Sequence, residues 1–212
     1  MSNKVIYGKR RQGKSTLALA LALQGSNRVI VFDPNGQFPL ISAIPIDGVA
    51  AWAESTRDNQ GYSLARVGPI DSEDIDDYFS SFAEDLFAEK NVSVIVDEAH
   101  MLQKPSFIHP ALDRWNRRSP ESVNLIQTTH RIVDCHVDSR YHADDVFIFY
   151  AYLPRELKTM EESFGPKGIS RYIERLQEHQ VLHWRKATGG VPKISIWDKS
   201  EEWYINLEND NR

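Results

Sequence analysis

The stretch GKRRQGKST, from Gly8 to Thr16, carries the residues with the clearest chemistry in this sequence. It matches the pattern G-x-x-x-x-G-K-[ST] at every fixed position. In such a loop, successive backbone N–H groups and the N-terminus of the next helix surround phosphate oxygens with donors. The lysine then reaches the β- and γ-phosphates of a nucleotide, and the serine hydroxyl ligates Mg²⁺. The predicted nucleotide-binding residues are Gly8, Lys9, Arg10, Arg11, Gln12, Gly13, Lys14, Ser15 and Thr16, with Lys14 also a catalytic candidate and Ser15 a metal ligand.

A secretory leader is a second interpretation of the same stretch, because three basic residues precede a run rich in Leu and Ala. The flanking residues favour the phosphate loop. Residues 4–7 predict a short strand that ends at Gly8, and residues 15–24 predict a helix that is apolar on all sides, as expected beside a sheet. The basic side chains themselves occupy variable positions of the motif. They are either solvated loop charges or contacts to DNA or to a neighbouring subunit.

Asp97 and Glu98 form a second chemical pair, directly after the apolar run at 92–96. In an enzyme with a phosphate loop, an acid at this place holds Mg²⁺, and we assign that role to Asp97. Glu98 is predicted to polarise the attacking water as a general base. The tetrapeptide DEAH also occurs in a class of helicases, but those need two RecA-like domains, which 212 residues do not comfortably supply. His100 is therefore interpreted as a local packing residue.

Composition sets the outer limits. The chain has 212 residues, enough for one substantial domain. Its net charge of −5 argues against a protein that coats nucleic acid over its whole surface, although a local basic patch is compatible with it. The single cysteine, Cys135, cannot form an internal disulfide. No apolar run approaches the roughly 18 residues of a membrane helix, so we expect a cytoplasmic protein without a membrane span.

Apolar periodicity predicts an α/β fold with a mainly parallel central sheet covered by helices. Strands are expected at 28–32, 62–67, 92–96, 123–129 and 146–150, and a helix capped by Ser72 is expected to bury Ile75, Phe79, Phe82 and Leu86. Beyond residue 150 we expect helices at 155–164 and 169–180 and an antiparallel hairpin formed by 181–185 and 194–197. Residues 1–150 are thus the predicted core, and 151–212 a helical and β-hairpin extension of the same domain. Trp184, Trp197 and Trp203 either pack on the core or bind a partner.

Four segments resemble the HerA/FtsK superfamily of DNA-translocating ATPases, and within it the small genome-packaging ATPases of viruses. They are GKRRQGKS, VFDPNGQF, VSVIVDEAH and VNLIQTTHR, and together they span about residues 3–150. Two departures stand out: Gln37 replaces a usual acid, and Arg11 stands where many members have Gly. The resemblance implies a RecA-like P-loop NTPase fold that binds ATP and Mg²⁺.

The resemblance also implies two further site residues. A sensor amide would fall on His130, so either His130 replaces it or Gln127 supplies the amide from within the strand. An arginine from one subunit would complete the ATP site of the next, where it stabilises charge on the transferring phosphoryl group. Arg114, Arg117 and Arg118 in DRWNRRSPE are the candidates, chiefly Arg117 and Arg118, unless they only face solvent at a helix end; Arg131 is a weaker one.

The function implied is ATP hydrolysis coupled to DNA translocation, serving viral genome packaging. Double-stranded DNA, a homo-oligomeric ring and a capsid or portal component are the partners expected, in the host cytoplasm or on the virion. A phage assembly or secretion ATPase of the zonular-occludens-toxin type, a small-molecule kinase and a nucleotide-regulated binding module are the alternatives.

Overall fold

The computed structural model describes residues 2–71, 73–150, 153–164, 169–177, 180–186 and 193–198, with the backbone alone for 118–122, 193 and 198. Among these residues, eight strands form one sheet: β1 (Asn3–Tyr7), β2 (Arg28–Phe32), β3 (Ser63–Val67), β4 (Val92–Val96), β7 (Val123–Thr129), β8 (Asp145–Phe149), β9 (Gln180–Arg185) and β10 (Lys193–Asp198). Strands β5 (Gln103–Lys104) and β6 (Phe107–Ile108) form a small separate hairpin. The helices are α1 (Lys14–Gly25), α2 (Val49–Ser55), α3 (Ile75–Leu86), α4 (Pro110–Ser122), α5 (Val137–Tyr141), α6 (Pro154–Phe164) and α7 (Ile169–Ile173), with 3₁₀ turns η1 (Ile46–Gly48), η2 (Ala99–Met101) and η3 (Ile132–Asp134).

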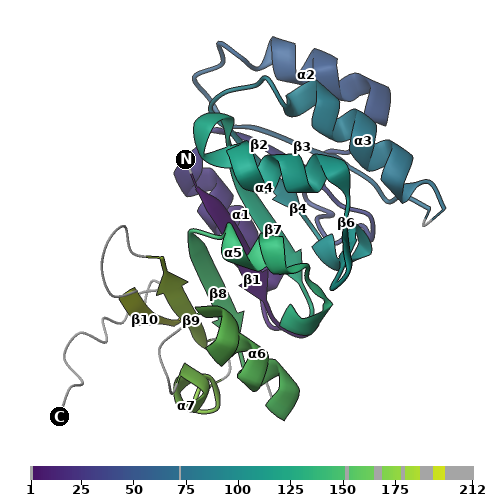
Figure 1. Cartoon of the computed structure of the whole chain (residues 1–212). Coiled ribbons are helices and arrows are strands. Elements are labelled where there is room, and N and C mark those ends of the chain that lie inside the picture. The colour runs from purple at the N-terminus through teal and green to yellow at the C-terminus, as the bar shows by residue number, and fades with distance from the viewer. Residues whose placement is uncertain are drawn as a thin grey trace.

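The sheet order is β10-β9-β8-β1-β7-β4-β2-β3 (Figure 1). All pairings from β8 to β3 are parallel, whereas β9 runs antiparallel to β8, and β10 antiparallel to β9. The mainly parallel sheet and the antiparallel hairpin predicted from the sequence are therefore confirmed. Because β9 pairs with β8, the described part of the C-terminal segment extends the same sheet.

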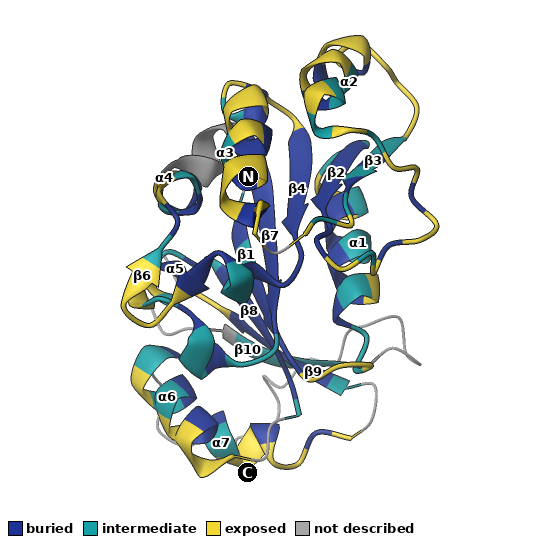
Figure 2. Cartoon of the chain, turned by 90° about the vertical axis from the view of Figure 1, so that its right-hand side faces the viewer, coloured by how far each residue is buried: buried dark blue, intermediate teal, exposed yellow. Residues whose placement is uncertain are grey.

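Helices cover both faces of the sheet, and the strands between them are buried (Figure 2). On one face, α1 packs its Leu and Ala side chains on Ile6 and Ile126. On the other face, α3 and α4 bury Phe79, Phe82 and Trp115 against Phe32. The α3 residues that recur at helical spacing all lie in this core, as predicted.

The structure departs from the sequence-based elements in several places, and α4, α5 and the β5–β6 hairpin are elements for which no range was predicted. The helix predicted at 169–180 ends at Ile173, where bonds such as that from the Leu176 N–H to the Ile173 carbonyl (3.3 Å) tighten the chain into a turn before β9. Helix α2 was not predicted, because it has 7 residues and buries only Val49 and Ala53, too few to show a helical period.

Several expectations concern the periphery of the fold. Trp184 packs on Phe164, with ring centroids 5.2 Å apart, and Trp197 meets Phe147 edge-on at 5.2 Å, so both pack on the core. Trp203, Ser72 and the hairpin turn at 188–190 lie outside the described residues. The helix expected to be capped by Ser72 begins at Ile75, and its N-cap position is held by Asp74. No helix in the described ranges combines the length and apolarity needed to cross a lipid bilayer.

Candidate nucleotide-binding site

The phosphate loop joins β1 to α1 at the edge of the sheet where the parallel strands end. Gly13 has φ 99°, in the left-handed region that favours glycine. A side chain at Gly8 would place its Cβ 2.8 Å from Phe149 Cβ, so the close passage of the loop over β8 requires glycine. Arg11 also has a positive φ of 66°, which gives a physical reason for glycine at this position in the proteins that the motif resembles. Gln12 closes the loop: its Oε1 accepts from the Lys9 N–H at 2.5 Å.

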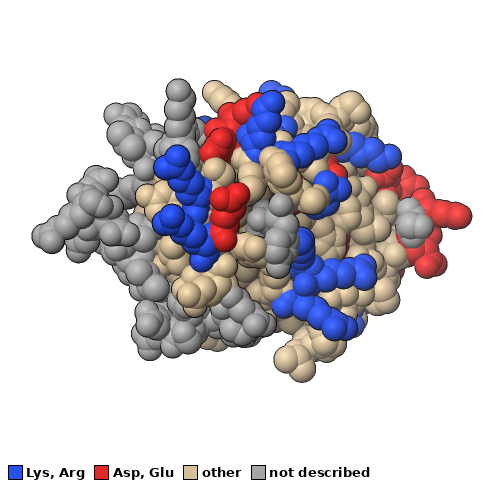
Figure 3. All heavy atoms as spheres, turned by 90° about the horizontal axis from the view of Figure 1, so that it is seen from below, with Lys and Arg blue, Asp and Glu red and all other residues tan. Residues whose placement is uncertain are grey.

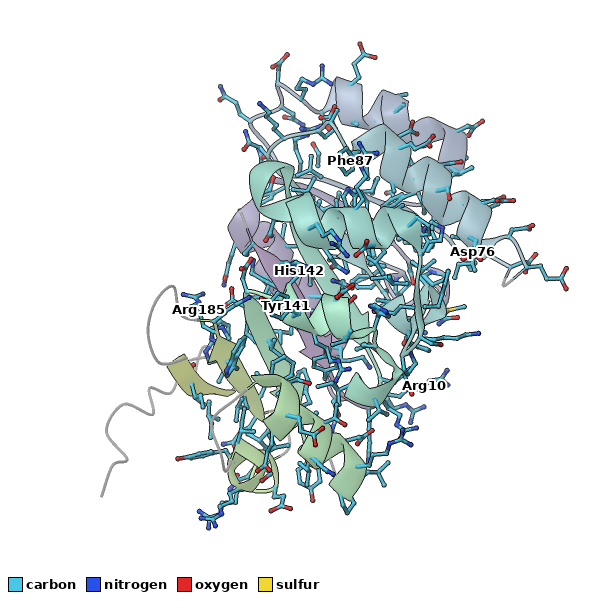
Figure 4. The ribbon with its side chains drawn as sticks, viewed as in Figure 1. Arg10, Asp76, Phe87, Tyr141, His142 and Arg185 are labelled. Atoms are coloured by element: carbon cyan, nitrogen blue, oxygen red, sulfur yellow. The ribbon has the colours of Figure 1, made fainter. Side chains whose placement is uncertain are left out.

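A cavity of about 740 Å³ opens over this loop. It is lined by seven of the nine predicted nucleotide-binding residues and by four residues from other segments: Arg10, Arg11, Gln12, Gly13, Lys14, Ser15, Thr16, Asn35, Gln37, Glu98 and His130. The other two predicted residues, Gly8 and Lys9, line a small cavity beside it. Figure 4 shows Arg10 at the right-hand side of the molecule, below its middle. The lining is mostly polar and rich in hydrogen-bond donors, as a phosphate group requires.

Lys14, His130 and Glu98 form a continuous polar chain across this cavity. The Lys14 ammonium donates to the Lys9 carbonyl at 3.1 Å and lies 3.3 Å from His130 Nδ1. On the far side of the same ring, His130 Nε2 lies 2.9 Å from Glu98 Oε1. The loop lysine and the acid after β4 are thus connected through one imidazole ring.

The environment fixes the charges of this chain. Burial, and then the nearby Lys14 ammonium, lower the pKa of His130, so its ring is neutral at neutral pH. Burial lowers the pKa of Lys14 as well, although Glu98 and Asp97 oppose that shift. Burial alone would raise the pKa of Glu98, but its contacts with His100, His130 and Lys14 outweigh it and lower the pKa, which keeps the carboxylate ionised.

Asp97 is held by the neighbouring strand. Thr128 Oγ1 donates to Asp97 Oδ1 at 2.5 Å and accepts from the Glu98 N–H at 3.1 Å. Burial raises the pKa of Asp97 to about 6. Its other oxygen, Oδ2, is buried without a hydrogen-bond partner among the described groups. An unpartnered buried carboxylate oxygen fits a hard cation such as Mg²⁺, so the donor set formed by Asp97 and Ser15 is compatible with that ion.

The DPNGQ segment supplies a second wall of the cavity through Asn35 and Gln37. The Asp33 carboxylate shapes it, because it accepts from the Gln37 N–H at 2.7 Å and the Phe38 N–H at 2.9 Å. Gly36 makes the turn with φ 67°. The sequence analysis singled out this segment, yet it assigned no site role to Asn35 or Gln37.

Two sequence-predicted residues lie elsewhere. Gln127 is buried in β7, where its Nε2 donates to Asn116 Oδ1 (2.8 Å) and Asn3 Oδ1 (3.2 Å), and it does not line the cavity. Arg117 is on α4, paired with Asp113 at 3.0 Å, and likewise does not reach this chain's own cavity.

Two of the other arginine candidates contact groups outside the cavity, and the side chain of the third is not described. Arg114 lies 3.3 Å from the Phe87 ring centroid, and Arg131 pairs with Glu156 at 2.8 Å. The side chain of Arg118 lies outside the described residues.

His100 is placed differently from its predicted packing role. Its Nδ1 lies 3.2 Å from Glu98 Oε2, and its ring centroid lies 5.4 Å from that of His130. The backbone that creates this contact is unusual: Glu98 has φ 51° and ψ 44°, a left-handed conformation that non-glycine residues rarely adopt. No signal in the sequence indicates that conformation.

No family model and no curated protein sequence matches the chain. Several solved structures do. The genome packaging NTPase B204 from Sulfolobus turreted icosahedral virus 2, in complex with AMPPCP, aligns with a TM-score of 0.70 at 19% identity, over 91% of this chain and 96% of that one. B204, the DNA-packaging ATPase from Sulfolobus Turreted Icosahedral Virus, aligns with a TM-score of 0.63 at 17% identity, over 91% and 96%. VirB4 of Thermoanaerobacter pseudethanolicus aligns with a TM-score of 0.61 at 12% identity, over 85% and 86%.

The fold and the site together define the class: the chain has the RecA-like fold of P-loop nucleoside triphosphatases. Within that class, its fold is similar to those of B204 and VirB4.

Proposed function

We propose that this chain hydrolyses ATP and couples the reaction to the translocation of DNA. The proposal of ATP hydrolysis rests on the chain of contacts from Lys14 through His130 to Glu98. This chain lines the cavity over the phosphate loop. A loop that only bound nucleotide would not need an ionised glutamate at this point.

Each of these groups has a role in the proposed reaction. Lys14 and the loop N–H groups bind the phosphates, and Glu98 orients and deprotonates the attacking water. His130 holds Glu98 and contacts the γ-phosphate region, a role that we assign to it rather than to Gln127. Asp97 and Ser15 would hold Mg²⁺, which neutralises charge on the phosphates when bound.

DNA is the proposed load. Figure 3 shows Lys and Arg side chains spread across the face on which the parallel strands end, the same face that carries the phosphate loop. Arg10 and Arg11 are exposed there and line the nucleotide cavity. Figure 3 shows Asp and Glu between these Lys and Arg side chains, so contact with the DNA backbone is proposed for local basic groups, which a net charge of −5 permits. The likeness in fold to the DNA-packaging ATPase B204 supports the same load.

Viral genome packaging by a homo-oligomeric ring is the finer form of this proposal. In it, Arg117 or Arg118 completes the ATP site of the next subunit, and the ring docks on a capsid or portal component. The exposed position of Arg117 on α4, outside its own site, supports a role across an interface.

The deciding measurement is steady-state ATP hydrolysis with Mg²⁺, with and without double-stranded DNA, at low and moderate salt. We expect DNA to stimulate hydrolysis, added salt to remove the stimulation, and Lys14→Ala and Glu98→Gln to abolish turnover. Hydrolysis that ignores DNA at low salt would replace the motor by an assembly ATPase of the zonular-occludens type. ATP binding without any turnover would leave a nucleotide-regulated binding module.

A further inference from the structure

His100 has no part in the function proposed above, yet it faces the glutamate on which that function depends. His100 Nδ1 and Glu98 Oε2 lie 3.2 Å apart. Both atoms are buried, and within the described part of the chain neither has a hydrogen-bond partner. A buried polar atom without a partner is costly. At 3.2 Å the two atoms are within hydrogen-bond distance, so a reorientation of the side chains that aligns the donor with the acceptor satisfies both.

The backbone fixes this arrangement from both sides of the histidine. Glu98 adopts its left-handed conformation, and the Met101 N–H then donates to the Glu98 carbonyl at 2.8 Å to close the 3₁₀ turn η2. Ala99 and Leu102 are 0% and 1% exposed and anchor this turn in the core against α3 and α4. The position of the His100 ring beside the carboxylate is therefore set by packed backbone.

The two oxygens of Glu98 face different histidines. His130 Nε2 lies 2.9 Å from Oε1, and His100 Nδ1 lies 3.2 Å from Oε2. A glutamate side chain has several rotatable bonds, and contact at both oxygens restricts the rotation of its carboxylate. A general base gains rate from such restriction, because the lone pair must point at the water that it deprotonates.

We propose that His100 is a positioning residue for Glu98, acting on the carboxylate through its Nδ1–H. The proposal depends on the hydrolytic role of Glu98 proposed above. His130 also contacts Lys14, so its hold on Glu98 changes when the lysine turns to a phosphate. His100 makes no contact with Lys14 and keeps the carboxylate oriented in both states.

The geometry allows a test by isosteres, because the amide nitrogen of asparagine lies near the place of Nδ1, and that of glutamine near Nε2. In the full chain, His100→Asn should retain kcat, whereas His100→Gln and His100→Ala should lower it about tenfold or more at unchanged KM for ATP. Rescue by asparagine alone is a result that a merely structural role would not give. His142→Gln, at a histidine that ends α5 and packs on Tyr141, is the matched control and should behave as the wild type.

Equal kcat in all three His100 variants and the wild type would overturn the proposal. So would a loss in His100→Asn as large as that in His100→Ala. A binding measurement with a fluorescent ATP analogue separates these outcomes from a damaged nucleotide site, because we expect its affinity to be unchanged in every variant.

A second readout does not need turnover. Nitrogen-resolved NMR of the imidazole groups should find a proton on His100 Nδ1 in the wild type, and this proton should be lost in Glu98→Ala. The His100 signals are assigned by their absence from His100→Asn. An unprotonated Nδ1 in the wild type would refute the positioning role. A wild type that carries the Nδ1 proton but hydrolyses no ATP would refute the proposed function and leave the Glu98–His100 contact intact.

Discussion

Lys14 of the phosphate loop donates a hydrogen bond to His130, with Nζ 3.3 Å from Nδ1. An ammonium group has no acceptor, so Nδ1 must be the unprotonated nitrogen of the neutral ring. The proton is then on Nε2, which lies 2.9 Å from Glu98 Oε1. The tautomer of one histidine thus follows from the charge of the lysine.

Substitution of Glu98 should separate binding from chemistry. Because Glu98 contributes a base and no phosphate contact, Glu98→Gln should keep ATP affinity and lose hydrolysis by about 10²–10⁴-fold. In Lys14→Ala, both ATP affinity and hydrolysis should be lost. Analogue binding and turnover measured on the same preparations test this, with Glu84→Gln on the exposed side of α3 as the control. Turnover near the wild-type rate in Glu98→Gln would exclude Glu98 as the base.

Isosteres of His130 should show the reverse of the pattern expected at His100, because His130 contacts Glu98 through Nε2. His130→Gln keeps a donor near Oε1 and should stay within about threefold of wild-type kcat, whereas His130→Asn should fall about tenfold. Turnover numbers at saturating ATP provide the comparison. If asparagine proves the better replacement, the contact with Lys14 matters more than that with Glu98.

A shared site across a subunit interface would be revealed by mixing. Arg117→Ala should lower turnover by about 10³-fold or more if its guanidinium completes a neighbouring site, without loss of ATP affinity. Mixed with Lys14→Ala subunits, it should regain activity above the sum of the two separate preparations. Arg171→Ala, at an exposed arginine of α7, is the control. A mixture no more active than its components would argue against Arg117 acting in trans.

The buried carboxyl group of Asp97 should make stability depend on pH. Its pKa is raised from 3.8 to about 6 by burial, so the folded chain holds this proton more tightly than the unfolded chain. The resulting stability is fully present below pH 4, and is lost as the pH rises through 6. The loss amounts to about 3 kcal/mol at 1.36 kcal/mol per unit.

Asp97→Asn should therefore raise the free energy of unfolding at pH 7 and change it little at pH 4. Chemical denaturation at both pH values, without divalent cations, measures the difference, and Asp113→Asn on the surface of α4 serves as the control. Destabilisation by Asp97→Asn at pH 7 would contradict the expectation.

Much of the fold could be predicted because its strands are continuous apolar runs, and the phosphate loop because its chemistry demands fixed residues. Because the strands are buried on both faces, the sequence could not show whether Gln127 or His130 is the sensor residue at the nucleotide site. All seven residues of β7 are buried, so the strand shows no polar alternation to tell which face Gln127 occupies. The contact between Asp97 and Thr128 could not be predicted from the sequence either. It depends on the register of two strands, in which Val96 pairs with Gln127.

The position of β1 in the sheet bears on how the chain is made. Its two neighbours are β7 and β8, which follow it by more than a hundred residues, and α1 and the phosphate loop depend on it for their place. During synthesis this strand has no partner until β7 has left the ribosome and lacks its second partner until β8 has followed, and such distant pairings form slowly. A chain halted before β8 should therefore be unable to bind nucleotide, although it already contains every residue of the loop. The loop is made well before the strands that hold it.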